Sequence, residues 1–78
     1  MATKVVQLTD APQLISTKAA FIDGVNNEFK FAFGTTVPTD LTIYHTAYKL
    51  WSDGSLGSVY AWNAGRMAVR MVVSEAAV

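Results

Sequence analysis

The clearest pattern along the chain is the alternation of aromatic with polar or small side chains at residues 28–33, EFKFAF. Phe29, Phe31 and Phe33 occupy every second position, so in an extended strand all three rings project from one face. On a helix, neighbours on one face are three or four positions apart, and this spacing would spread the rings around the axis. The segment is therefore predicted to be a strand with one apolar face.

Turn-forming residues separate the other apolar segments at intervals of about ten residues, a spacing typical of an all-β sandwich or barrel. Residues 13–23 are expected to be the hairpin partner of the strand 28–33. Residues 66–75 also alternate, and they are expected to pair with residues 58–63 across the short turn between them. Residues 3–8 are expected to form a further strand at an edge.

Residues 40–50 do not follow one pattern. Their apolar spacing is partly helical, but their Thr, Ile and Tyr content favours extended structure. At most one helical turn is expected near Asp40, followed by a strand that reaches Trp51. The sequence thus predicts one all-β domain over residues 1–78, either a small antiparallel sandwich or a partly open barrel of about six short strands.

The composition adds an expectation of association with other chains. Of the 78 residues, 51% are hydrophobic and only 15% are charged, and the formal net charge is zero. These values exclude a disordered chain, which needs low hydrophobicity and high net charge. A chain this small hides only about 60% of its surface on folding, so much apolar surface stays outside. The chain has no cysteine, so no disulfide can stabilise the fold. Association with other chains is therefore the expected source of added stability. A compact monomer with a partly apolar surface is the alternative.

The charge and the apolar segment lengths also bear on partners. Zero net charge argues against a chain-wide electrostatic attraction to nucleic acid. Arg66 and Arg70 share a strand face, but two arginines are better explained as a solvated or interface face. No apolar segment has the length of a signal-peptide core or a membrane span. We therefore expect a soluble chain, made inside a cell, that binds neither nucleic acid nor a membrane.

No residue pattern predicts catalysis. His45 is the only histidine, and neither a Gly-x-Ser-x-Gly elbow nor a phosphate-binding glycine motif accompanies it. The scattered carboxylates lack metal-ligand spacing. Asp40 and Asp53 could in principle form a glycosidase pair, but so short a chain can hardly supply a deep substrate cleft as well. The chain is expected to be no enzyme and to use no metal and no cofactor.

Aromatic residues crowd the second half of the chain, and two hypotheses beyond a core role remain open for them. Trp, Tyr and Arg are enriched at protein interfaces, where they act as anchors. The residues expected at subunit or partner contacts are Trp51, Tyr60, Trp62, Arg66 and Arg70. Planar rings beside polar groups could instead stack on sugars. The residues expected to bind a glycan in that alternative are Tyr44, Tyr48, Trp51 and Asp53.

Several short stretches within residues 14–76 carry a resemblance to a known group of proteins. They are Ala32-Phe33-Gly34, Pro38, Asp40-Leu41, Tyr44-His45-Thr46, the turn at 52–57, Tyr60-Ala61-Trp62 and Val72-Val73-Ser74-Glu75. In these residues the chain resembles small virion-associated proteins of tailed bacteriophages. The resemblance implies a structural protein that decorates or cements a phage capsid.

The same resemblance implies a homotrimer that binds the major capsid protein or other virion proteins. It implies assembly in the host cytoplasm and a final location on the capsid surface or on an appendage. Residues 1–8 and 76–78 are then expected to act as interaction arms that become ordered on binding. A carbohydrate-binding module of a phage fibre or spike is the alternative function.

Overall fold

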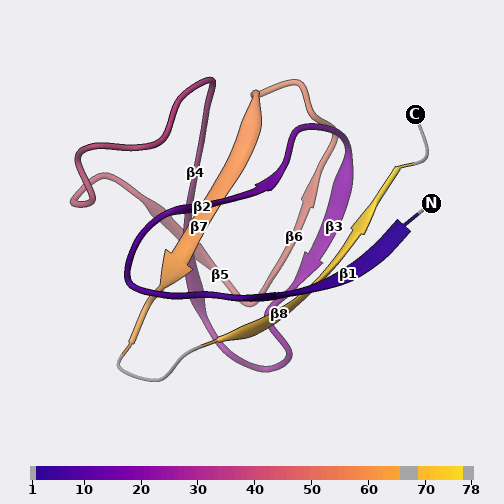
Figure 1. Cartoon of the computed structure of the whole chain (residues 1–78), viewed down its shortest axis with the longest axis horizontal. Coiled ribbons are helices and arrows are strands. Elements are labelled where there is room, and N and C mark those ends of the chain that lie inside the picture. The colour runs from indigo at the N-terminus through magenta and orange to yellow at the C-terminus, as the bar shows by residue number, and fades with distance from the viewer. Residues whose placement is uncertain (1, 66–68, 77–78) are drawn as a thin grey trace.

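Two antiparallel sheets of four strands each make up the fold (Figure 1). The computed structural model describes residues 2–65 and 69–76. The strands, in chain order, are β1 (Ala2–Gln7), β2 (Gln13–Ser16), β3 (Ala20–Asp23), β4 (Phe29–Gly34), β5 (His45–Ala47), β6 (Lys49–Ser52), β7 (Ser58–Asn63) and β8 (Arg70–Glu75). The predicted all-β sandwich is confirmed, although the described residues form eight strands rather than about six.

The order of strands in each sheet differs from their order in the chain. Sheet I has the order β1-β8-β3-β6, and sheet II has the order β2-β7-β4-β5. The chain passes from one sheet to the other at every connection between consecutive strands except the one between β4 and β5. These crossings let each sheet contribute one apolar face to a shared interior.

The three phenylalanines of β4 lie on its inner face, as the alternation predicts. Phe29 is fully buried and Phe31 is 6% exposed, while Phe33 is partly buried and packs at the margin of the core. The ring centroids of Phe29 and Phe31 are 5.8 Å apart, and those of Phe31 and Phe33 are 5.6 Å apart. The side chains of sheet I that complete the interior are Ala20, Ile22, Met71 and Val73.

Both predicted hairpins are wrong. Residues 13–23 divide into β2 and β3, which belong to different sheets, and β4 pairs instead with β5 and β7. Strand β8 pairs with β1 and β3 rather than with β7, and residues 66–68 of the predicted last strand lie outside the described residues. Alternation indicates which face of a strand is buried, but it does not indicate which strand lies beside it.

Two other predictions concern strands at the edges of the sheets. Strand β1 is at an edge, as expected. Between residues 40 and 52, the chain makes a turn in which Ile43 N–H donates to Asp40 C=O. It then forms β5 and β6, which Tyr48 separates. The predicted single strand is thus bent across a corner of the sandwich, so that its two halves serve different sheets.

The expected N-terminal arm is part of sheet I in the folded chain. Strand β1 pairs along its whole length with β8, and Leu8 is fully buried with its N–H donating to Val69 C=O over 2.8 Å. Figure 1 shows β1 running alongside β8, in agreement with this pairing. At the other end, Ala76 N–H donates to Ala19 C=O over 2.8 Å, and residues 77–78 lie outside the described residues.

Strand β7 is buried on both faces. Val59 and Ala61 point into the core, while Tyr60 and Trp62 point outward from sheet II yet are only 7% and 3% exposed. The ring of Tyr44, in the segment before β5, meets the ring of Trp62 edge-on at a centroid distance of 6.3 Å. Trp62 is therefore packed within the chain itself.

We expect Trp62→Ala to lower the free energy of unfolding by about 3–5 kcal/mol, because the substitution leaves a cavity where a large buried ring packs. Urea unfolding followed by circular dichroism measures the change. Trp51→Ala is the matched control, since Trp51 is 63% exposed, and it should change the free energy by about 0.5 kcal/mol at most. Equal losses for the two variants would contradict the burial of Trp62.

The turn between β3 and β4 holds a valine in an unfavourable backbone conformation. Val25 has φ 54° and Asn26 has φ 65°, and Asn27 N–H donates to Gly24 C=O over 3.2 Å. Two central residues with positive φ define a type I′ turn. Asparagine tolerates this region, whereas a β-branched residue is strained there.

We expect Val25→Asn to raise the free energy of unfolding by about 1 kcal/mol, because it relieves the left-handed strain without losing a buried contact. Val25 is 45% exposed, so little packing is at stake. Thermal unfolding measures the change. Val37→Asn is the control, because Val37 is a similarly exposed loop valine without a positive φ. An equal gain in the control would show that the turn conformation is not the cause.

Candidate functional site

The outer face of sheet I carries an exposed aromatic pair. Trp51 of β6 is 63% exposed and lies directly opposite Phe21 of β3, which is 41% exposed. Leu50 packs against the core, so the next side chain along β6 projects outward. Val72 of β8 is paired with Val5 of β1, which is 53% exposed, and both project from the same side. We call Val5, Phe21, Trp51 and Val72 the apolar face.

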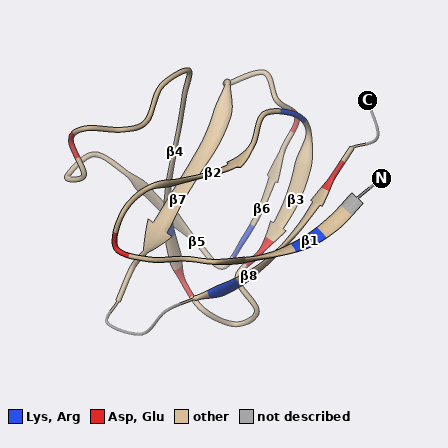
Figure 2. Cartoon of the chain, viewed as in Figure 1, with Lys and Arg blue, Asp and Glu red and all other residues tan. Residues whose placement is uncertain are grey.

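Charges of both signs border the apolar face. Asp23 of β3 lies directly opposite Lys49 of β6, and Arg70 projects outward at the start of β8, opposite Gln7. Figure 2 shows positive and negative residues spread over the drawn chain, with no concentration of one sign. In the register of β3 with β8, Phe21 lies opposite Ser74 and Val72 lies opposite Asp23, so the two apolar pairs of this face are diagonal neighbours with polar residues beside them. Apolar side chains mixed with charges of both signs are typical of a protein contact surface rather than of a nucleic-acid surface.

The five residues predicted at subunit contacts do not form one surface. Trp51 and Arg70 both lie on the outer side of sheet I. Tyr60 and Trp62 are buried on the outer side of sheet II, so in the folded chain they are not exposed to a partner. Arg66 lies outside the described residues. The sequence shows that Tyr60 and Trp62 share a face, but only the tertiary structure shows that another segment covers it.

The four residues of the glycan hypothesis are also divided. Tyr44 lies against the outer side of sheet II, while Trp51 lies on the outer side of sheet I. Tyr48 stands between β5 and β6 and is 57% exposed. Asp53 Oδ1 accepts a hydrogen bond from Ser55 N–H over 2.9 Å, so one carboxylate oxygen is already engaged. Because the sandwich lies between Tyr44 and Trp51, the four residues do not make one stacking platform.

Phe21 and the two valines are the members of the apolar face that the sequence analysis did not select. The sequence places Phe21 in a predicted strand but predicts the wrong neighbour for that strand, so no sequence pattern puts Phe21 beside Trp51. The cross-strand pair depends on the register of β3 with β6. That register brings together residues 30 positions apart in the chain, and no local pattern encodes it.

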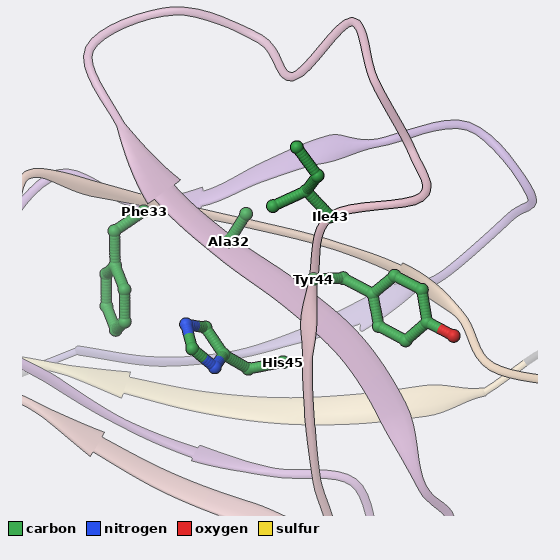
Figure 3. Close-up of a pocket in the computed structure, with 5 residues that line it drawn as sticks. All are labelled: Ala32, Phe33, Ile43, Tyr44 and His45. Carbon is green, nitrogen blue, oxygen red and sulfur yellow. The ribbon is translucent and has the colours of Figure 1, made fainter.

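A small cavity lies on the other side of the molecule, beside β4 and β5. Its volume is about 230 Å³, and its lining residues are Ala32, Phe33, Ile43, Tyr44 and His45. Figure 3 shows the imidazole of His45 pointing toward Phe33, while the ring of Tyr44 points away from both. These five residues include one imidazole and one phenol, and no carboxylate to orient the imidazole. The cavity is also smaller than the roughly 300–1,000 Å³ of typical ligand pockets.

Tyr44 is held by a cation as well as by a ring. Lys30 Nζ lies 4.4 Å from the centroid of the Tyr44 ring, and Lys30 is paired with Trp62 across β4 and β7. The lysine, the tyrosine and the tryptophan thus pack together on the outer side of sheet II. A cation over an aromatic face is attractive, so this cluster fixes the segment before β5 on the sheet.

Glu75 ties the two sheets together. Ser16 Oγ, from β2 of sheet II, donates to Glu75 Oε2 over 2.8 Å, and Lys4 Nζ lies 3.2 Å from Glu75 Oε1. The hydrogen bond from Ser16 and the neighbouring Lys4 ammonium hold the pKa of Glu75 below its ordinary value of 4.5. The ionised form is therefore favoured in the folded chain, and this carboxylate is a structural group.

Glu75→Gln is expected to flatten the acid side of the stability profile. A lowered pKa contributes stability that is fully present above about pH 4.5 and is lost as the pH falls through the folded value. Between about pH 6 and about pH 3, thermal unfolding of the variant should therefore shift less than that of the wild type. Part of the slope remains, because hydrogen bonds from Thr42 and Ser55 also lower the pKa of Asp40 and Asp53.

Glu28→Gln is the control for this measurement, because Glu28 is exposed. It removes one exposed carboxylate that is not part of the tie to Ser16 and Lys4, and its profile is the reference for Glu75→Gln. A Glu75→Gln profile that matches the wild type would show that the tie to Ser16 and Lys4 contributes nothing to stability.

Within residues 2–65 and 69–76, no group of three or more His, Asp and Glu side chains is placed to hold a metal ion. None of the described residues belongs to a helix of the length and apolarity that a membrane crossing requires. Comparisons with protein-family models, with curated proteins and with solved structures found no match to this chain. The candidate site therefore rests on the geometry of the apolar face.

Proposed function

We propose that this chain is a non-catalytic structural protein of a virion, of the kind that decorates or cements a phage capsid. The apolar face is then the surface that contacts the major capsid protein or another virion protein. The observation that carries the proposal is the exposure of Trp51 beside Phe21 on a regular sheet face. Tryptophan is the residue most enriched among interface hot spots, and burying such a ring drives association.

The size of the face suits a contact that is repeated many times. Four strands about 4.8 Å apart, with four to six residues at about 3.3 Å each, give an area on the order of 300 Å². A stable single contact buries about 800 Å² on each partner. One copy would therefore bind weakly through this face alone. On a particle, many linked contacts act together through effective concentration, which is how a cementing protein works.

The alternative functions have less support. A carbohydrate-binding module needs its rings on one platform, and Tyr44 and Trp51 lie on opposite outer sides of the sandwich. An enzyme needs an oriented acid, base or nucleophile, and the cavity beside His45 offers one imidazole and one phenol. The apolar face needs no further group to serve as a contact.

The test uses particles of a tailed phage that carries this sequence, grown without its own copy of the gene. Tagged variants are supplied in the host, and purified particles are assayed by quantitative mass spectrometry against the major capsid protein. Trp51→Ala should raise the dissociation constant for the particle at least about tenfold, the loss expected for a hot-spot residue of 1.4 kcal/mol or more, and should therefore lower occupancy when the variant is supplied in limiting amount. Tyr48→Ala, which removes a ring of similar exposure away from the face, should leave occupancy unchanged.

Two results would contradict the proposal in different ways. If the wild-type chain is missing from purified particles, the virion role is wrong. If Trp51→Ala is incorporated as well as the wild type, the role can stand but the apolar face is not the contact. Circular dichroism of each variant confirms that a loss of occupancy is not a loss of fold.

A further inference from the structure

Strand β1 differs from the other strands at the sheet edges. It has six residues, and its register with β8 is unbroken from Ala2 to Gln7. The other edges are shorter, with four residues in β2, three in β5 and four in β6, and the pairing of β2 is also interrupted by a register shift. Short or bulged edge strands resist pairing with other chains, whereas a long regular edge invites it.

The backbone groups that β1 leaves free follow from one hydrogen bond. Leu8 N–H donates to Val69 C=O, which continues the register of β1 with β8. In an antiparallel pair, every second residue exchanges bonds with its opposite residue. Counting back from Leu8, the N–H and C=O groups of Thr3, Val5 and Gln7 point away from β8. Within the described residues, no strand pairs with that side of β1.

We propose that β1 pairs antiparallel with β1 of a second copy of this chain, across a two-fold axis at Val5. The free groups of β1 are arranged symmetrically about this residue, so Val5 meets its own copy and Thr3 meets Gln7 on each side. Three hydrogen-bonded pairs give roughly six backbone hydrogen bonds. The two copies of sheet I then form one continuous sheet. This pairing does not depend on the virion role.

The side chains favour this register over its neighbours. Centred on Val5, the pairing places Lys4 opposite Val6 of the second copy. A register centred on Lys4 would set the two Lys4 ammonium groups opposite each other, and like charges directly opposite are destabilising. A register centred on Val6 would leave Thr3 outside the ladder. The Val5 register therefore uses every free group of the edge and opposes no like charges.

A second copy also fits the apolar face better than an unrelated strand would. Val5 is 53% exposed and belongs to that face. At the axis it would contact its own copy, so the pairing buries an exposed apolar side chain on both partners. The zero formal net charge of the chain removes the general repulsion between identical copies. One contact thus satisfies the unpaired backbone and covers apolar surface.

The test is sedimentation equilibrium of the purified chain alone, over a concentration series that reaches about 1 mM, the range in which weak association is detected. The wild type should approach twice its subunit mass of 8.4 kDa. Val5→Lys places two ammonium groups opposite each other at the axis and should raise the dissociation constant at least about tenfold. Val37→Lys is the control, since Val37 is equally exposed in a loop, and it should sediment like the wild type.

A second pair of variants tests the register directly. The chain has no cysteine, so Val5→Cys introduces a single thiol at the axis. Opposite residues in a hydrogen-bonded antiparallel pair have Cα atoms about 5.5 Å apart, within the range that a disulfide spans. Val5→Cys should form a covalent dimer under mild oxidation. Lys49→Cys, on β6 at the other edge of sheet I, should not.

The proposal is overturned if the wild type stays monomeric throughout the series. A stable mass of three subunits, as the phage resemblance implies, would also overturn it, because a two-fold axis gives an even number of copies. The proposal is also overturned if the Val5→Lys variant associates as strongly as the wild type. These experiments use the purified chain without phage particles. Their outcome is therefore independent of whether the proposed virion role is correct.

Discussion

Burial of the two inner sheet faces against each other is the constraint on which the rest of this structure depends. A chain of 78 residues can form only one interior, and Phe29, Ile22 and Val73 are among the side chains that fill it from both sheets. To bring both faces to that interior, the chain repeatedly passes from one sheet to the other. Each strand therefore turns one face toward the core. Whether its other face is covered or exposed depends on other segments of the chain.

The outer face of sheet II is partly covered by another segment of the chain, whereas the outer face of sheet I keeps exposed aromatic residues. On sheet II, the segment before β5 lies over β7, and Tyr44 with Lys30 packs on Trp62. On sheet I, Trp51 and Phe21 stay exposed. So small a domain has too little chain to cover both sides. Within residues 2–65 and 69–76, the exposed Trp51–Phe21 pair and the edge of β1 with which no other strand pairs both belong to sheet I. Both proposed contacts are therefore on this sheet.

How far the sequence predicts these features depends on whether the feature is local. The alternation of Phe29, Phe31 and Phe33 reports a strand and its buried face, because side-chain direction depends only on the strand's own period of two. Strand pairing is not local, and the predicted pairing is wrong. The sequence pattern predicts residues 13–23 as the neighbour of β4, whereas the neighbours of β4 are β5 and β7. The alternating pattern of one strand fits several partners equally well.

The aromatic residues show the same division. From the sequence, Trp51 and Trp62 are equivalent candidates for a contact, since each lies in a predicted strand. In the structure, one is 63% exposed and the other 3%. By itself the sequence determined an all-β chain, the inward face of its clearest strand and an excess of apolar side chains. Only the tertiary structure decided which aromatic residues are covered and which remain free, because that depends on contacts between segments far apart in the chain.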